Sequence, residues 1–484
     1  MNEHYDLVVI GAGPAGEKGA AQAAYFGKRV CIVERAPRPG GAAINTATIP
    51  SKTLRETALY FSGLRQHGLY GVDYHIKQDI TISDFMLRER SVIEAEWKLI
   101  EENIRKHEIA EVRGAATFVD SQTLEVARFG EETRRLTSDV FLIATGSHPL
   151  PPKEIHVDGG VIVDSETVLT LEKIPASMIV VGGGMIGCEY ACTFAALGVR
   201  VTIVTGRTRL LAHLDPEVSD ALRRQMTGRL GVSVHLDAEV TGLAVESGRA
   251  VVTLGGGDQI SADCALYATG RIGASAGLGL EALGVRTNAR GFIAVNDHYE
   301  TDAPRVYAAG DVIGFPALAS TSMEQARVAV CHAFDFRYKR AIAGVIPYGV
   351  YTIPEIATVG ATEEHLRAKG IDFEVGRASF RANARGQIIG DLEGFVKIIF
   401  RPEDQRLLGA SIVGDDAAEL IHIAMACLSF DGTIDFFIQS VFNYPSLADA
   451  YKYAAYDGLQ ALARRHAKRP GLPTSGPHRV VPPS

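Results

Sequence analysis

The chain carries the pattern Gly-x-Gly-x-x-Gly twice, each time between the same kinds of predicted element. One copy follows the apolar run 5–10 and the other follows 177–181, and a helical pattern and a second β-rich stretch come after each. In this context the glycines make a tight turn, let a pyrophosphate approach the backbone and let helix pack on strand. They are Gly11, Gly13 and Gly16 in the first copy and Gly182, Gly184 and Gly187 in the second. The repeat predicts an α/β protein with two Rossmann-like dinucleotide-binding domains.

The copies differ 23 residues after their first glycine, where the next strand should end and meet a ribose. The first copy has Glu34 there, and a carboxylate accepts hydrogen bonds from ribose hydroxyls but repels a 2′-phosphate. The second has Thr205, followed by Arg207 and Arg209. Two solvated arginines in a loop are one interpretation, but two guanidiniums beside a neutral residue can also attract a 2′-phosphate. We therefore predict two different dinucleotides, the second of which can be phosphorylated.

Composition fits a large enzyme and excludes several classes of partner. With 484 residues, 46% hydrophobic and 22% charged, the chain has the length of about three domains. A net charge of −8 argues against nucleic acid or an anionic membrane as a partner, and no apolar run is long enough to span a bilayer. Because the N-terminus is acidic and enters a strand at once, it does not fit a signal peptide, and we expect a cytoplasmic protein.

The six cysteines are scattered, with neither Cys-x-x-Cys nor a spacing typical of metal ligands. This usage indicates a reducing compartment, and we expect no metal site. Cys188 and Cys192 lie four residues apart in the helix predicted after the second fingerprint. A redox or metal role is open for this pair, and packing of small side chains between helix and sheet is favoured.

Recurring turns divide the chain into domains. The predicted strands 140–144 and 266–268 both run into the turn Ala-Thr-Gly. One of these turns precedes the second fingerprint in the sequence and the other follows it. We infer that the chain leaves the first dinucleotide-binding unit, builds the second, and returns through a strand at 306–309 and a helix at 321–336. The predicted domains are 1–149 and 271–345 for the first unit, 150–270 for the second, 346–463 for a C-terminal α+β domain, and 464–484 for a disordered, proline-rich tail.

The C-terminal domain is predicted from a change of pattern near residue 347. Apolar runs at 348–353, 395–400 and 408–413 are typical of strands, and 417–430 is typical of an apolar helix. No fingerprint occurs there, so we expect a domain that forms an interface rather than one that binds a dinucleotide.

The segment from Gly40 to Lys52 points to a family. It reads GGAAINTATIPSK and, with the twin fingerprints, the Ala-Thr-Gly turns and Gly310-Asp311, it resembles the FAD-dependent pyridine nucleotide–disulfide oxidoreductases over residues 4 to about 463. That family's loop has the form GGxCxxxxCxPSK, and its cysteines form the disulfide that takes electrons from the flavin. Ala43 and Thr48 stand at the two cysteine positions. Neither side chain can form a disulfide or a thiolate, so disulfide reduction through this loop is excluded.

The C-terminal motif departs from the family in the same direction. Disulfide reductases of the family carry a histidine and a glutamate here that shuttle the thiol proton. The matching stretch, 442–451, has Asn443 and Asp449 instead, and an amide is no base near neutral pH. The thiol acceptor and its proton-transfer partner are therefore missing together, which fits an enzyme that needs neither.

One subfamily, the soluble pyridine nucleotide transhydrogenases, is similar at Thr-Ile-Pro-Ser-Lys (48–52), at Phe-Asn-Tyr-Pro (442–445) and at 351–356. That resemblance implies non-covalent FAD, NAD(H) and NADP(H) as substrates, and ping-pong hydride transfer at one nicotinamide site. It also implies a homodimer, possible higher oligomers, and Asn443 reaching the partner's flavin. Ala43 is a departure, since the subfamily often keeps a cysteine there.

The resemblance also implies site residues. Lys52 is expected beside flavin N5, paired with Glu189 of the second fingerprint helix, and these two are the predicted catalytic residues. The predicted FAD contacts are Gly11, Gly13, Gly16, Glu34, Arg35, Gly41, Ala43, Thr48, Lys52, Thr145, Gly146, Arg271, Gly310 and Asp311. The predicted NAD(P) contacts are Gly182, Gly184, Gly187, Glu189, Thr205, Arg207, Arg209 and Gly270.

Three other functions remain open at this point. A quinone reductase or NAD(P)H oxidase would use the same flavin and equally needs no cysteine pair. A non-catalytic redox sensor or interaction protein is disfavoured because the fingerprints, Lys52 and Glu189 are intact. A disulfide reductase that uses another pair of the six cysteines is the least favoured.

Overall fold

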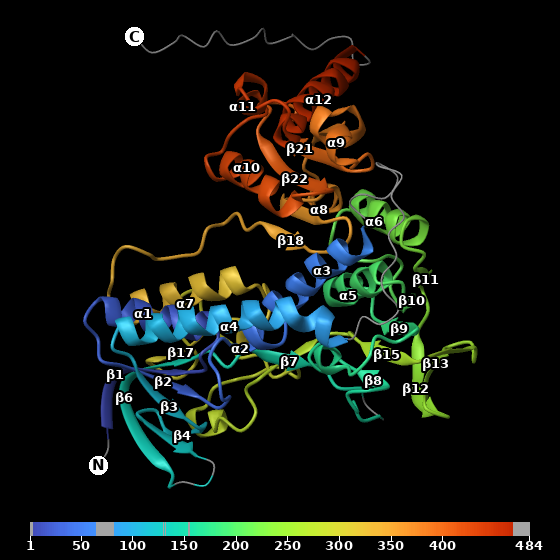
Figure 1. The fold of residues 1–484 in the computed structure, drawn as a ribbon. Coiled ribbons are helices and arrows are strands. Elements are labelled where there is room, and N and C mark those ends of the chain that lie inside the picture. The colour runs from blue at the N-terminus through green and yellow to red at the C-terminus, as the bar shows by residue number, and fades with distance from the viewer. Residues whose placement is uncertain (1–2, 64–81, 129, 131, 153–154, 468–484) are drawn as a thin grey trace, which may run out of the picture. The chain divides into compact units, whose positions relative to one another are not determined.

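The computed structural model describes residues 3–63, 82–128, 130, 132–152 and 155–467 (Figure 1). The chain divides into two compact units. Unit 1 comprises Met1–His213, Ser219–Gly344 and Tyr351–Ile353, and unit 2 comprises Leu214–Val218, Val345–Val350 and Pro354–Ser484. Among the described residues, no helix combines the length and the apolar character needed to cross a membrane.

Unit 1 contains a seven-stranded sheet built around the first fingerprint. Its strands are β1 (Glu3–Ile10), β2 (Val30–Glu34), β3 (Ala110–Arg113), β4 (Ala115–Asp120), β5 (Thr123–Ala127), β6 (Arg134–Ile143) and β17 (Val306–Ala308). The order is β3-β2-β1-β6-β5-β4, and β17 pairs in parallel with β6. The predicted return of the chain at 306–309 is thus observed as a strand of this sheet. Helices α1 (Pro14–Tyr25) and α7 (Ala319–Ala333) pack against each other beside it.

A second, parallel sheet in unit 1 is built around the second fingerprint. Its order is β11 (Ser233–His235), β10 (Arg200–Val204), β9 (Ser177–Val181), β15 (Cys264–Tyr267) and β8 (Ile162–Val163). Helix α5 (Met185–Ala196) follows β9, α6 (Pro216–Gly228) follows β10, and an antiparallel sheet joins β12 (Val240–Glu246), β13 (Arg249–Leu254) and β14 (Gln259–Ala262). The outgoing and returning chain pair as β7 (Ser147–Pro149) and β16 (Arg271–Gly273).

The segment after β2, predicted to be a loop, is largely helical. It forms α2 (Gly41–Asn45) and α3 (Thr48–Ser62), and after the undescribed residues 64–81 the chain continues as α4 (Ile82–Lys106). Gly40, with a left-handed φ of +104°, makes the turn into α2. Pro50 lies in the first turn of α3, where the missing N–H costs no intrahelical hydrogen bond.

Unit 2 is an antiparallel sheet covered by helices. Its strand order is β18 (Tyr348–Val350), β19 (Ile356–Gly360), β22 (Leu407–Val413), β21 (Phe395–Phe400) and β20 (Glu374–Ser379). Its helices are α8 (Glu363–Ala368), α9 (Ala384–Ile389), α10 (Ala417–Ser429), α11 (Asp435–Gln439) and α12 (Ala450–Ala467). Fully buried aromatic side chains, Phe380, Phe400, Phe437 and Tyr451, form the centre of its core.

Two predicted boundaries in this region differ from the structure. The strand predicted at 348–353 ends at Val350, because the N–H of Tyr351 donates to the Glu189 carboxylate (2.9 Å) instead of a neighbouring strand. The tail predicted from residue 464 begins as a continuation of α12, which ends at Ala467. Residues 468–484 lie outside the described residues.

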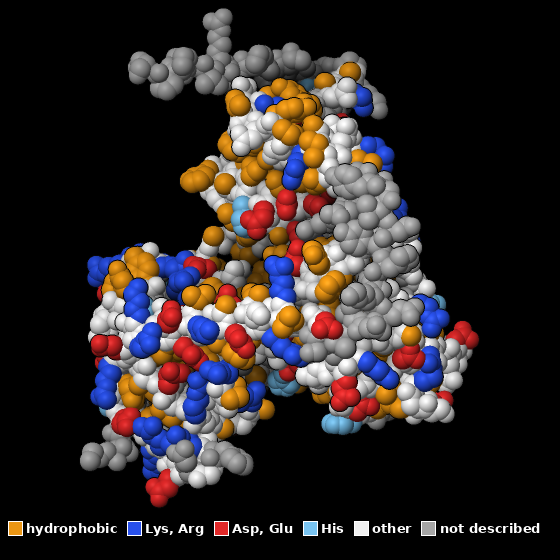
Figure 2. Space-filling view, in the orientation of Figure 1, with side chains coloured by type: hydrophobic (Ala, Val, Ile, Leu, Met, Phe, Trp, Pro, Cys, Tyr) orange, Lys and Arg blue, Asp and Glu red, His pale blue; other side chains and the backbone are white. Residues whose placement is uncertain are grey.

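Hydrophobic side chains are exposed on unit 2, where Figure 2 shows them gathered over the helices near the C-terminal end. Large exposed hydrophobic residues of unit 2 include Phe430, Phe436, Val441, Tyr444, Tyr453 and Tyr456, of which Phe430 is 87% and Val441 95% exposed. Exposed apolar groups on this scale are typical of a surface that another protein covers.

We predict that Gly376→Ala destabilises unit 2. A Cβ at Gly376 would lie 2.0 Å from the carbonyl oxygen of Ala454 in α12, so the helix must move away from β20. We expect the free energy of unfolding to fall by about 1–3 kcal/mol, measured by urea unfolding. Gly344→Ala is the control, because a Cβ there meets nothing within 4 Å. Equal unfolding midpoints for the two variants would contradict the prediction.

Candidate functional site

The two fingerprints form cradles of the same geometry. Gly11 and Gly182 have φ values of +104° and +121°, and an added Cβ would lie 2.5 Å from the Ala144 oxygen and 2.4 Å from the Ala268 oxygen, respectively. The third glycines are as restricted, since a Cβ on Gly16 would lie 1.8 Å from the oxygen of Gly11. A Cβ on Gly187 would lie 2.1 Å from the oxygen of Gly182. The chain's own backbone therefore requires glycine at all four positions.

The middle glycines face space instead of backbone. Gly13 and Gly184 precede α1 and α5, and no side chain caps either helix. A Cβ on Gly184 would meet nothing within 4 Å, and one on Gly13 would meet only Gly41, at 3.7 Å. Each helix thus presents uncapped N–H groups beside an open glycine, and this arrangement fits a pyrophosphate. Gly41 brings the start of α2 against the first cradle.

The strand ends beside the cradles carry the predicted ribose-binding residues. Both Glu34 carboxylate oxygens accept backbone N–H groups, from Ala12 (2.7 Å) and Ala36 (2.7 Å), so the carboxylate is fixed and retains lone pairs for hydroxyls. The next residue, Arg35, is exposed.

At the second strand end, Thr205 is buried and its Oγ1 accepts the Arg207 N–H at 3.3 Å. The Arg207 side chain is exposed beside it, whereas Arg209 is half-buried and donates to the carbonyl of Ala212 (2.9 Å). The structure thus brings Thr205 and Arg207 together and directs one guanidinium nitrogen of Arg209 into its own loop.

Lys52 and Glu189 form a half-buried ion pair, as expected. The Lys52 Nζ lies 2.7 Å from Glu189 Oε2, although α3 and α5 are far apart in sequence. The other oxygen of Glu189 accepts the N–H of Tyr351, and the Lys52 ammonium lies 5.0 Å from the centroid of the Tyr351 ring. The Glu189 side chain is 8% exposed and that of Lys52 is 26% exposed. One carboxylate, itself fixed by the Tyr351 N–H, and one aromatic face thus hold the positive charge.

Tyr351 was not among the predicted site residues. Its signal in the sequence was only that it opens the stretch 351–356, which the resemblance already singled out. The contact itself depends on how the chain returns to unit 1 at Tyr351–Ile353.

A polar chain runs through the predicted flavin contacts near the β7–β16 pair. Arg271 donates to the hydroxyl (2.8 Å) and the carbonyl (2.7 Å) of Ser147, and that hydroxyl donates to the carboxylate of Asp311 (2.9 Å). Sequence reasoning missed Ser147, whose role depends on strand pairing. Thr145 Oγ1 is buried with no partner among the described residues, and such an orphaned hydroxyl fits contact with a bound group.

The glycines of the two Ala-Thr-Gly turns and of the Gly310-Asp311 turn have left-handed or otherwise restricted backbones. Their φ angles are +74° at Gly146, +148° at Gly270 and +83° at Gly310. The Gly310 N–H donates to the side chain of Gln325 in α7 (2.9 Å). The turns that bracket the second fingerprint are thus held in conformations that side-chain-bearing residues rarely adopt.

The cysteine positions of the family loop lie in helices here. Ala43 is in α2 and Thr48 begins α3, and both are partly exposed. All six cysteines are buried and unpaired. Cys188 and Cys192 contact backbone carbonyls of Gly183 (3.6 Å) and Ile353 (3.8 Å), and burial raises the pKa of both thiols, that of Cys192 to about 12. Packing is therefore their role in this fold.

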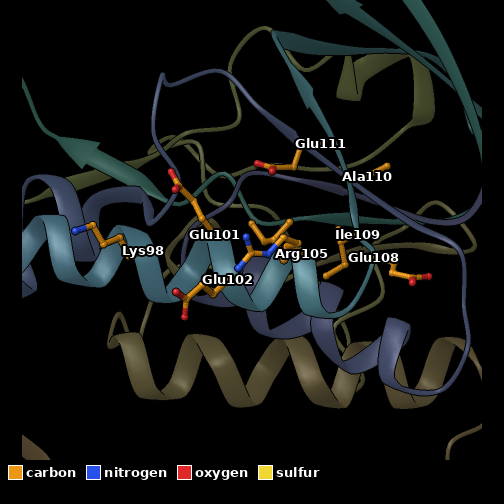
Figure 3. A pocket seen from close by; sticks show the side chains of 9 residues that line it. Lys98, Glu101, Glu102, Arg105, Glu108, Ile109, Ala110 and Glu111 are labelled. Carbon is orange, nitrogen blue, oxygen red and sulfur yellow. The ribbon is translucent and has the colours of Figure 1, made fainter.

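A surface hollow of about 720 Å³ lies at the end of α4 and along β3 (Figure 3). Its lining residues are Lys98, Glu101, Glu102, Ile104, Arg105, Glu108, Ile109, Ala110 and Glu111. Charges of both signs line it, and none of the predicted site residues does. We assign it no role.

Proteins of similar sequence carry a common name. The chain is 43% identical over 459 residues to a soluble pyridine nucleotide transhydrogenase of Mycobacterium tuberculosis, covering 95% of this chain and 98% of that protein. It is 37% identical over 461 residues to one of Colwellia psychrerythraea, covering 95% and 98%.

Solved structures share the fold. LpdA from Mycobacterium tuberculosis has a TM-score of 0.86 at 26% identity, covering 94% of this chain and 99% of that chain. The HOCl-induced flavoprotein disulfide reductase RclA from Escherichia coli has a TM-score of 0.83 at 27% identity, covering 93% and 99%.

Family models match both parts of the chain. Residues 5–333 match the pyridine nucleotide-disulphide oxidoreductases and residues 346–455 match the dimerisation domain of the same proteins. The predicted family and fold class, with two Rossmann-like domains and a C-terminal dimerisation domain, are thereby confirmed. The chain belongs to the pyridine nucleotide-disulphide oxidoreductase family, whose members bind FAD.

Proposed function

We propose that the protein transfers hydride between NADPH and NAD⁺ through bound FAD, as a soluble transhydrogenase. One structural observation carries the proposal: two intact dinucleotide cradles are joined by the Lys52–Glu189 pair, while the adjoining loop has Ala43 and Thr48 where a disulfide would stand. Relatives at 37% to 43% identity bear the transhydrogenase name, which supports the same choice.

The first cradle is assigned to FAD. Its glycines would hold the pyrophosphate at the N-terminus of α1, and Glu34 would bind the adenosine ribose. Asp311, oriented by Ser147 and Arg271, would meet the ribityl or pyrophosphate region. Bound FAD supplies a two-electron centre that takes a hydride from one nicotinamide and returns it to another. Arg35, Gly41, Ala43, Thr48, Thr145, Gly146 and Gly310 complete the proposed set.

Lys52 would stabilise the negative charge that accumulates near flavin N5 when hydride arrives. A preorganised cation can do this without moving, because Glu189 and the Tyr351 ring already fix it. Hydride transfer requires no thiol and no proton shuttle, which is consistent with Asn443 at the family's histidine position. Positioning of the two rings then supplies most of the catalysis.

The second cradle is assigned to the nicotinamide dinucleotide. Glu189 belongs to the second turn of α5, the helix that begins at this cradle, so the carboxylate links the nucleotide-binding helix to Lys52. Thr205 carries no negative charge that would repel a 2′-phosphate, and Arg207 offers a guanidinium beside it. Tolerance of both NAD(H) and NADP(H) at one site is what a ping-pong transhydrogenase needs.

Residues 346–455 match a dimerisation domain, which supports a homodimer, and the exposed hydrophobic residues of unit 2 supply the area for it. We further propose a cytoplasmic protein in which FAD is bound by 1–149 and 271–345 and NAD(P) by 150–270. Dimerisation is assigned to 346–463, and Asn443 reaches the partner's flavin.

We predict that the FAD-replete protein reduces thio-NAD⁺ with NADPH under anaerobic conditions, with parallel-line kinetics in absorbance assays, because both coenzymes use one site in turn. Apoprotein without FAD is the control. If NADPH bleaches the flavin, and a quinone or oxygen but not thio-NAD⁺ restores it, the enzyme is a quinone reductase or oxidase instead. A flavin that NADPH cannot bleach would indicate a sensor without catalysis.

We predict that Lys52→Met and Glu189→Gln slow flavin reduction by NADPH about 10- to 100-fold in stopped-flow measurements. The first variant removes the preorganised positive charge, and the second removes the carboxylate that fixes it. Lys339→Met is the matched control, because Lys339 is 25% exposed and pairs with Glu324 outside this site. Rates that change equally in all three variants would show that the Lys52 pair has no special role.

We predict that thiol reagents leave turnover unchanged. All six cysteines are buried, and burial raises the pKa of Cys31 and Cys264 to about 12 and that of Cys427 to about 11, so few thiolates exist at pH 8. Ellman's reagent should label none of the six in the folded protein and all six after denaturation. Loss of activity on alkylation of the folded enzyme would instead support a disulfide reductase.

A further inference from the structure

Trp97 is the only tryptophan of the chain, and it contacts the segment that borders the first cradle. It lies half-buried in α4, and its indole Nε1–H donates to Oδ1 of Asn45 at the end of α2 (2.9 Å). Helices α2 and α4 both belong to unit 1 and are in contact. One hydrogen bond between side chains 52 positions apart thus joins them. The proposed function gives neither residue a role.

Asn45 closes the segment 39–45 on itself. Its Nδ2 donates to the carbonyl oxygens of Pro39 (3.1 Å) and Gly41 (2.9 Å). Because an indole N–H can only donate, Trp97 holds the oxygen side of the amide toward α4 and leaves the nitrogen side for these two carbonyls. One side chain therefore fixes the shape of the segment and attaches it to α4.

The other side of the segment 39–45 rests on the first cradle. The Gly40 N–H donates to the carbonyl of Ala12 (2.8 Å). A Cβ on Gly41 would lie 2.8 Å from Cα of Gly13, so the two backbones meet without room for a side chain. The segment is thus a wall of the cradle assigned to the FAD pyrophosphate, held at Ala12 on one side and at α4 on the other.

Arg38 makes a second, weaker contact with α4. Its guanidinium lies 5.2 Å from the centroid of the Trp97 ring, and its Nη1 lies 2.9 Å from Oε1 of Glu101. The two side chains of this ion pair are 54% and 41% exposed, and pairs this open to water contribute little. A half-buried amide or indole N–H that loses its partner costs more. The bond between Trp97 and Asn45 is therefore the contact on which the attachment to α4 depends.

The second cradle is more open at the corresponding place. A Cβ on Gly184 would meet no atom of the described residues within 4 Å, whereas one on Gly13 would meet Gly41 at 3.7 Å. A ping-pong enzyme makes different demands on its two sites, since FAD has to stay bound while two nicotinamide nucleotides exchange in turn. The wall stands at the cradle whose ligand is retained, and the cradle whose ligand must leave is open at Gly184.

We propose that Asn45 and Trp97 are positioning residues that retain FAD, because they hold the segment 39–45 against the first cradle. The proposal rests on the proposed function, which assigns FAD to this cradle. A wall that is already fixed loses little freedom when the cofactor binds, so the affinity for FAD is higher and its release slower. A wall attached only at Gly40 could move away from Gly13 and release the pyrophosphate.

The test measures FAD release from the full-length, FAD-loaded homodimer after dilution, followed by the fluorescence of free flavin. Asn45→Ala removes all three hydrogen bonds of the amide, and we expect the dissociation constant for FAD to rise about 10-fold. Trp97→Phe keeps an aromatic ring but removes the N–H donor, and we expect a rise of about threefold. Trp97→Phe also keeps the proposal testable where Asn45→Ala fails to fold. Dissociation constants equal to the parent's in both variants overturn the proposal.

The double variant shows whether the two residues act as one unit. Since the Trp97 N–H acts through Asn45, the double variant should bind FAD as weakly as Asn45→Ala alone, within about twofold. Independent effects would instead multiply to about 30-fold and contradict the shared role.

The emission of Trp97 reports on the contact itself, since no other tryptophan contributes. In Asn45→Ala the indole N–H bonds to water instead of the amide, so the emission should shift to longer wavelength. An unchanged spectrum would show that the contact with Asn45 does not hold the indole and would overturn the proposal.

Two controls remove comparable groups elsewhere in unit 1. Asn296→Ala removes an amide that accepts the N–H groups of His298 (2.9 Å) and Glu300 (3.1 Å). Glu101→Gln removes the charge that pairs with Arg38 but keeps the indole contact. Both variants should bind FAD within about twofold of the parent. A loss in Asn296→Ala as large as that in Asn45→Ala would show a general loss of stability and overturn the proposal.

Binding of 2′,5′-ADP to the second cradle, measured by calorimetric titration, separates positioning from a structural role. Its affinity should stay within about twofold of the parent in every variant, because this cradle does not contact the wall. Equal losses for FAD and 2′,5′-ADP would show a merely structural role and overturn the inference. A parent protein that binds no FAD would overturn the proposed function as well, whereas equal FAD binding by parent and variants overturns the inference alone.

Discussion

Close approach of backbone to backbone at the two fingerprints determines the rest of this structure. The oxygens of Gly11 and Gly182 occupy the space that a side chain at Gly16 or Gly187 would need. Each helix therefore starts directly against its own strand, and no side chain caps its first N–H groups. Once α5 is fixed in this way, Glu189 is carried on its second turn to a place where it can hold Lys52.

The Lys52–Glu189 pair is formed although the family's disulfide is missing from this chain. The loop after β2 still packs against the first cradle, through Gly41, and still carries Lys52 into the same unit as the second cradle. Without the two loop cysteines the chain lacks the disulfide that accepts electrons in the family. With Asn443 in place of the histidine it also lacks the base that serves that disulfide. What remains is the fixed charge of Lys52, paired with the helix that begins at the second cradle, and the proposed hydride exchange requires neither a thiol nor a base.

Much of the fold was predictable because its signals are local. The strands at 177–181 and 395–400 have the predicted bounds, since a glycine directly follows the first apolar run and directly precedes the second. Contacts between residues that are far apart in the sequence were not predictable in this way. Lys397 reads as an ordinary strand residue, and only the folded chain brings Asp215 to it. Lys52 and Glu189 were paired by resemblance, whereas Tyr351 and Ser147 had no signal of their own.

The β7–β16 pair has a consequence for how such a chain can have been assembled. Ser147–Pro149 leaves the first sheet and Arg271–Gly273 comes back, and the two are hydrogen-bonded neighbours. Everything between them therefore departs from and returns to points about one strand spacing, ~4.8 Å, apart. A short turn could join those points and leave the first sheet closed. The chain between these two strands therefore leaves and re-enters at neighbouring points, and any chain that replaced it would also have to deliver a carboxylate to Lys52.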